Sequence, residues 1–129
     1  MKIAILGAGS CFAINLATHL VNRGDEVLSI SRSPLRSDPF TFGLSTCPIF
    51  HYEQAHLVKE LPRIMVLLDV FRPDIIINFA ALCEVGLSWN HALDYYETNL
   101  MSLVRLTNEI SIRSWFKKFV QIGSSEVYG

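Results

Sequence analysis

A short run of small residues near the start of the sequence, "GAGSCFA" from Gly7 to Ala13, could bind a phosphate group. It follows an apolar segment and precedes a stretch with helical spacing, so its backbone amides would lie at the start of a helix. Such amides are unpaired and carry partial positive charge, which favours an anion where the side chains are small. The residues of this turn that we expect to bind a cofactor are Gly7, Gly9, Ser10, Cys11 and Phe12.

The glycine pattern of this turn is degenerate. Read as Gly-x-Gly-x-x-Gly, it fails at Phe12. Read as Gly-x-x-Gly-x-x-Gly, it gives Gly7, Ser10 and Ala13, of which only the first is glycine. The Ser10 hydroxyl could donate to a phosphate, and Ala13 is small enough for close helix packing. A strand-to-helix turn that binds no nucleotide stays open as the alternative.

A second group of polar residues follows the predicted strand at 26–30. An acidic residue at the end of this strand would hold the ribose hydroxyls of NAD, but Asp25 and Glu26 lie at its start. Ser31 and Arg32 come after it, and an arginine in this place accommodates the 2'-phosphate of NADP. We therefore expect NADP to be favoured, with NAD as the other cofactor; a solvated loop arginine is the alternative interpretation.

The elements that must position these residues alternate between strands and helices. The first helix should end near Gly24, and residues 31–48 lack periodicity, so they are predicted to be a loop where a doubly wound fold normally has its second helix. The remaining expected elements are strands at 2–6, 26–30, 47–52, 74–80 and 117–123 and helices at about 54–71 and 92–114. This order predicts an α/β, Rossmann-like, doubly wound parallel sheet of about five strands, incomplete as it stands.

Composition and charge argue against several classes of partner. A net charge of -1 over 129 residues gives no broad basic field for nucleic acid or an anionic membrane, and no apolar run is long enough to cross a bilayer. The three cysteines form no Cys-x-x-Cys pair and the four histidines do not cluster, so no metal site is expected. A reduced, cytoplasmic setting is the default for such a sequence.

Three later segments, "RPDIIINFAA", "NHALDYYETNL" and "QIGSSEVYG", lie at or beyond a strand end or on the following helix. With the glycine turn they resemble the extended short-chain dehydrogenase/reductase family, the NAD(P)-dependent sugar-nucleotide epimerases and dehydratases, over essentially all 129 residues. The resemblance implies that residues 1–129 are a dinucleotide-binding domain. It further implies an enzyme that acts by transient hydride transfer from a sugar carbinol of a nucleotide sugar, and a homodimer.

The resemblance also implies roles for single residues. Family members pass the nicotinamide side of the cofactor along "NFAA", which adds Phe79, Ala80 and Ala81 to the cofactor-binding residues. The catalytic hydroxyl of the family matches Ser124, which would orient the substrate oxygen. Glu126 would act in proton transfer, as the acid does in certain dehydratases and decarboxylases.

An asparagine on the long helix belongs to the family's catalytic hydrogen-bond network, and Asn99 matches it. Its spacing from Tyr96 and Leu103 predicts that it lies on the buried face of the helix. A buried amide needs partners, so we expect Asn99 to be either a member of the catalytic relay or a clamp on neighbouring backbone.

The family's base is a tyrosine with a lysine four residues on, and the 129 residues contain no such pair. Tyr128 has no lysine after it. We therefore expect the Tyr-x-x-x-Lys segment and the substrate lobe to lie downstream of Gly129, and the 129-residue chain by itself to bind the dinucleotide without turnover. A non-catalytic dinucleotide-binding or regulatory module is the alternative, and the sugar and the reaction outcome, whether dehydration, epimerisation, decarboxylation or reduction, are left open.

Overall fold

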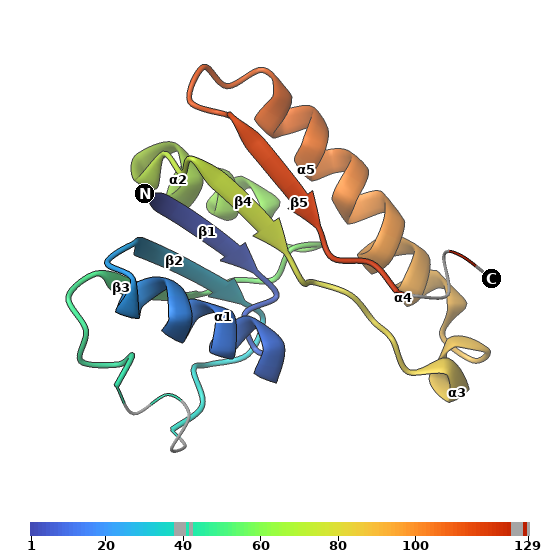
Figure 1. Cartoon of the computed structure of the whole chain (residues 1–129). Helices are drawn as coiled ribbons and strands as arrows, with labels where there is room; N and C mark the ends of the chain where they lie inside the picture. Colours follow the sequence, from blue (N-terminus) through green and yellow to red (C-terminus); the bar gives the residue numbers. More distant parts are fainter. Residues whose placement is uncertain (38–40, 42, 125–127, 129) are drawn as a thin grey trace.

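Five parallel strands form the centre of the protein, in the order β3-β2-β1-β4-β5 (Figure 1). The computed structural model describes residues 1–37, 41, 43–124 and 128. The elements run β1 (Lys2–Leu6), α1 (Cys11–Asn22), β2 (Glu26–Ser31), β3 (Phe50–Gln54), α2 (Leu61–Phe71), β4 (Ile75–Asn78), α3 (Val85–Ser88), α4 (Ala92–Tyr96), the π-helical η1 (Glu97–Met101), α5 (Ser102–Ser111) and β5 (Lys118–Gln121). The predicted Rossmann-like parallel sheet is confirmed.

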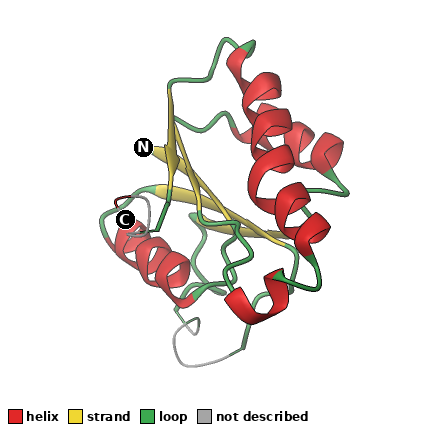
Figure 2. Cartoon of the chain, turned by 90° about the vertical axis from the view of Figure 1, so that its right-hand side faces the viewer, coloured by secondary structure: helices red, strands yellow, loops and turns green. Residues whose placement is uncertain are grey.

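Helices lie on both sides of this sheet (Figure 2). Because successive side chains of a strand point to opposite faces, β1 contributes side chains to two separate hydrophobic cores. Ala4 and Leu6 pack in a cluster with α2 and α5, whereas Ile3 and Ile5 pack in a second cluster with α1. Burial on both faces explains why the central strands are apolar at nearly every position.

The sheet order reverses at β1, which lies between β2 and β4. In register, Leu6 is the partner of Ile30 on β2 and of Asn78 on β4. The residues that follow these three strands therefore emerge at one level of the same edge. In open parallel sheets such a reversal point leaves a crevice beyond the carboxyl ends of the strands.

The third strand and the helix after it lie later in the chain than predicted. The prediction of a strand at 47–52 was wrong by three residues at its start and two at its end, because β3 covers Phe50–Gln54. The helix predicted from about residue 54 begins only at Leu61, followed by Pro62, a residue suited to the first turn of a helix. Residues 55–60 are consequently a turn at the carboxyl end of β3.

The loop between β2 and β3 supplies the cover that a second helix would give. Its Leu44 is buried in the same cluster as Ile14 and Leu20 of α1. Thr41 is also buried. Part of the sheet face beside α1 is thus covered by residues of this loop.

The helix predicted at 92–114 consists of α4, η1 and α5 in direct succession, and it ends at Ser111. The wider π-helical turn changes which residues of the helix face the core. Ser102, Leu106 and Ile110 are buried, but Asn99 is exposed, so its prediction as a buried residue was wrong. A strict 3.6-residue period does not hold across η1.

Asp74 ties the start of the sheet together. Its carboxylate accepts from the Lys2 backbone amide at 2.9 Å and from the Lys117 ammonium group, so it joins β1 to the segment before β5. The Lys117 hydrogen bond, followed by that of the Lys2 amide, lowers the pKa of Asp74 below its usual value. The ionised form is thus favoured in the folded protein.

A carboxyl whose pKa is lowered on folding stabilises the protein above its unfolded pKa of about 4 and ceases to do so as the pH falls through the lower, folded value. We expect Asp74→Asn to have a lower urea midpoint than the wild type at pH 7. The difference between the two midpoints should become smaller as the pH falls from 5 to 2. Urea unfolding followed by circular dichroism at a series of pH values measures this. Asp94→Asn, at an exposed carboxylate, is the control. A difference in urea midpoint between Asp74→Asn and the wild type that stays constant with pH would contradict the stabilising role of the ionised Asp74 carboxylate.

Candidate functional site

A cavity of about 320 Å³ opens at the carboxyl edge of the sheet. Four segments that follow strands line it, together with Thr98 from η1. The lining residues of these segments are Gly7, Gly9 and Ser10 after β1, Ser31–Pro34 at and beyond the end of β2, Ala55–Val58 after β3 and Phe79–Leu82 after β4. The cavity therefore lies where the strand order reverses.

Gly7 lets the first turn contact the chain that leaves β4. Its φ is +72°, in the left-handed region, and a Cβ atom there would lie 2.4 Å from the Ala80 backbone nitrogen. A side chain at this position would force the two segments apart. The glycine is therefore needed for the wall that β1 and β4 share.

Gly9 allows the first turn to lie close to the Ser31 side chain at the end of β2. A Cβ atom there would lie 3.0 Å from the Ser31 hydroxyl oxygen, so even a small side chain would occupy the space between the turn and the end of β2. The turn thus forms a cradle of backbone atoms with little side-chain bulk. A phosphate group fits such a cradle.

The start of α1 supplies donors at this cradle. Ser10 caps the helix, and its hydroxyl oxygen accepts from the Ala13 amide at 3.2 Å, which leaves its own O–H to donate. The first amides of a helix have no partner within it, so those of Cys11 and Phe12 face the helix terminus. The two side chains are exposed and do not line the cavity, and Phe12 is 75% exposed.

Side chains of β3 hold the predicted cofactor residues after β2. Gln54 donates to the Arg32 carbonyl oxygen at 3.0 Å, and the Tyr52 hydroxyl donates to that of Ser33 at 2.8 Å. Burial raises the pKa of Tyr52, which keeps this hydroxyl protonated. Ser31 is buried, whereas the Arg32 side chain is exposed at the rim of the cavity.

The segment after β4 is fixed by two asparagines. Asn78 is buried; its amide nitrogen donates to the Gln121 side chain at 2.8 Å, and its oxygen accepts from the Ala80 amide at 3.1 Å. Asn99 accepts from the Leu82 amide and donates to the Leu82 carbonyl, both at 2.8 Å. In this structure Asn99 acts as a clamp on the backbone of a cavity-lining residue.

The predicted cofactor residues and the predicted catalytic residues differ in their placement. Gly7, Gly9, Ser10, Ser31, Arg32 and the segment Phe79–Ala81 all line the cavity. Ser124 is exposed three residues beyond the end of β5 and is not part of the lining. The prediction for Glu126 falls outside the described residues.

The contribution of the turn after β3 was not predicted from the sequence. His56, Leu57 and Val58 line the cavity, but they lay within the region predicted to be a helix. A correct boundary for β3 would have found them, because the carboxyl ends of parallel strands meet at one edge. Thr98 was missed because the π-helical turn that carries it has no simple sequence signal.

The described residues form neither a metal site nor a membrane-spanning helix. Among residues 1–37, 41, 43–124 and 128, no group of three or more His, Cys, Asp or Glu side chains could hold a metal ion. In the same part of the chain, no helix combines the length and apolar character needed to cross a membrane.

The NAD dependent epimerase/dehydratase family model matches residues 3–129 of the chain. No curated protein matches it. Many solved structures share its fold.

The UDP-glucose-4-epimerase of Stenotrophomonas maltophila, with bound NAD and formylated UDP-arabinopyranose, is 23% identical with a TM-score of 0.82. The UDP-glucose 4-epimerase of Bifidobacterium longum, in complex with NAD+ and UDP, is 23% identical with a TM-score of 0.83. The Bordetella bronchiseptica enzyme WbmG, in complex with NAD, is 19% identical with a TM-score of 0.81. Each match covers 100% of this chain but only 38% of the two epimerases and 39% of WbmG, so the chain spans about two fifths of their length.

Proposed function

This chain belongs to the NAD-dependent epimerase/dehydratase family, and we propose that it is the cofactor-binding part of an enzyme acting on a nucleotide sugar by transient hydride transfer from a sugar carbinol. The observation that carries the proposal is the cavity at the reversal point of the sheet, with Gly7 and Gly9 in its wall. The three similar structures described above hold NAD, and two of them also hold UDP or a UDP-sugar.

The dinucleotide, when bound, would accept the hydride from the sugar and return it. Its pyrophosphate would lie on the amides of the Gly9–Ser10 turn and the start of α1, with the Ser10 hydroxyl as a further donor. Ser31 and Arg32 would hold the adjoining ribose. Ala80 and Ala81 are small, so the chain after β4 would approach the nicotinamide side closely.

The roles on the substrate side are carried by the family resemblance. Ser124 would orient the substrate oxygen, Glu126 would move a proton, and Asn99 would support the cofactor wall through Leu82. Removal of a hydride from a carbinol also requires a base within hydrogen-bond reach, and the 129 residues contain no Tyr-x-x-x-Lys pair.

We assign that base and the substrate lobe to a segment outside these 129 residues, in line with the greater length of the similar structures. Whether the whole enzyme is a dehydratase or an epimerase depends on that segment. Turnover of any nucleotide sugar by the 129-residue chain alone would contradict this assignment.

A non-catalytic dinucleotide-binding module is the second candidate function. The lack of a Tyr-x-x-x-Lys pair in the 129 residues favours it, and a reading frame that continues into Tyr-x-x-x-Lys would exclude it.

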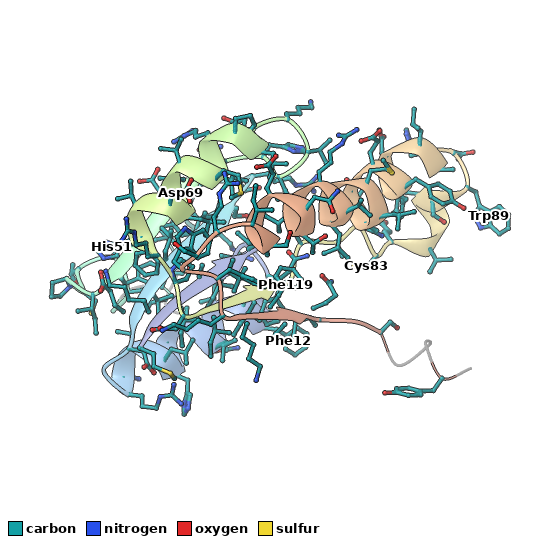
Figure 3. The ribbon with its side chains drawn as sticks, turned by 90° about the horizontal axis from the view of Figure 1, so that it is seen from above. Phe12, His51, Asp69, Cys83, Trp89 and Phe119 are labelled. Atoms are coloured by element: carbon teal, nitrogen blue, oxygen red, sulfur yellow. The ribbon has the colours of Figure 1, made fainter. Side chains whose placement is uncertain are left out.

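An exposed apolar row on the helices supports a homodimer. Leu93, Tyr96, Leu100 and Val104 follow one another along α4, η1 and α5 and are all exposed. Trp89 is 84% exposed and lies at the end of the molecule opposite His51 (Figure 3). Apolar rows of this kind commonly mark a protein interface.

We expect sedimentation velocity to give a dimer for the wild type and a monomer for Leu100→Glu. A monomeric wild type would contradict the proposed homodimer.

The cofactor preference follows from Arg32 and is the sharpest test of the proposed site. Its guanidinium group is exposed at the cavity rim, on backbone held by Gln54, so it could pair with a 2'-phosphate. We expect the wild type to bind NADPH more tightly than NADH, and Arg32→Ala to lose about tenfold in affinity for NADPH alone, the size of a charge-assisted hydrogen bond. Isothermal titration calorimetry measures both cofactors, and Arg105→Ala, on the exposed surface of α5, is the control. Equal affinities of the wild type for NADPH and NADH would contradict the predicted preference for NADPH.

A further inference from the structure

Tyr95 on α4 is a polar residue that the proposed function leaves without a role. Its ring is half-buried, and its hydroxyl donates to the Glu84 carbonyl oxygen, eleven residues earlier in the chain. Tyr95 is not among the described residues that line the cavity. Any effect of this side chain on a bound cofactor must therefore pass through the backbone that it holds.

Tyr95 and Asn99 hold the same stretch of backbone from one side of the helix. They are four residues apart, in α4 and η1, and helical residues at this spacing are neighbours on one face. Asn99 pairs with both backbone groups of Leu82 at 2.8 Å, and Tyr95 pairs with the Glu84 carbonyl two residues further on. Together the two side chains fix both the position and the direction of residues 82–84.

The segment that these two side chains hold has little support from packing. Residues 79–84 form neither helix nor strand, and residues 83–87 are exposed. Figure 1 shows the chain leaving the sheet after β4 and running out to α3, a helix that is described in full and has no buried residue. A segment with few buried contacts depends on its hydrogen bonds for a fixed position.

The place of this segment in the cavity wall indicates which half of a dinucleotide it would meet. Leu82 lines the cavity on the side of β4, and Arg32 lines it on the side of β2. The strand order β2-β1-β4 puts the phosphate cradle, which follows β1, between these two sides. A dinucleotide with its pyrophosphate in the cradle extends one half toward each side. With the adenosine ribose at Arg32, as proposed above, the nicotinamide half meets the side of Leu82.

We infer that Tyr95 is a positioning residue for the nicotinamide half of the dinucleotide, acting through the Glu84 carbonyl on the wall that contains Leu82. The inference rests on the proposed dinucleotide site. Without the Tyr95 hydroxyl, Asn99 is the remaining side chain that holds the segment, and Leu82 is free to turn about that single residue. Ordering the segment then becomes part of the cost of binding the nicotinamide half. The adenosine side, built by β2 and β3, is unchanged.

Tyr95→Phe removes the hydroxyl and keeps the ring, and Tyr96→Phe makes the same change at the next residue, which is 64% exposed, as the control. Calorimetric titration of each protein with NADH and with ADP, which lacks the nicotinamide riboside half, separates the two sides of the site. We expect Tyr95→Phe to weaken NADH binding about fivefold, the size of one neutral hydrogen bond, and to leave ADP binding unchanged. Tyr96→Phe should bind both ligands as the wild type does. Thermal melting checks that both variants fold.

The outcomes separate the inference from the proposed function. A purely structural role of Tyr95 would lower the melting temperature and leave both dissociation constants unchanged, which would overturn the inference and leave the dinucleotide site standing. An equal loss of affinity for NADH and ADP would also overturn it, because the hydroxyl would then act on the whole site. Failure of the folded wild type to bind either ligand would overturn the proposed function and the inference with it.

Discussion

The close approach of Gly7 to the chain leaving β4 is the constraint on which the rest of the site depends. Three strands meet at this residue, because its amide donates to the Ile30 carbonyl at 2.9 Å, the Phe79 amide donates to the Leu6 carbonyl at 2.8 Å, and a Cβ atom would lie 2.4 Å from the Ala80 nitrogen. With any larger residue the exits of β1 and β4 would separate. The two walls of the cavity would then lose their common edge.

Two walls of the cavity are held in part by side chains from neighbouring elements. Gln54 and Tyr52 of β3 fix the backbone after β2, and Asn99 of η1 fixes Leu82 after β4. The turn after β3 differs, since His56 is held by Val58 and Glu60 within the same turn. The polar groups that would meet a cofactor are thus positioned by hydrogen bonds present in its absence, which reduces the ordering cost of binding.

The sequence predicted the parts of the fold whose pattern is local and strong. The segments around Ile5, Ile30 and Ile76 are apolar on both faces, as buried parallel strands must be, and the turn after β1 followed from them. The edge strand β3 carries His51, Glu53 and Gln54, so its boundary was misplaced, and His56 was missed with it. The exposure of Asn99 could not be predicted, because the π-helical turn breaks the period from which its face was inferred.

The central claim is that the space left open by the first turn binds a dinucleotide, and Gly9→Val tests it most directly. Gly9 lacks a left-handed φ and its Cβ would meet only the end of the Ser31 side chain, so the variant should fold and melt close to the wild type while filling the cradle. Calorimetric titration should show saturable binding of NADPH to the wild type and at least a tenfold loss in Gly9→Val. An affinity that is unchanged in the folded variant would contradict the account.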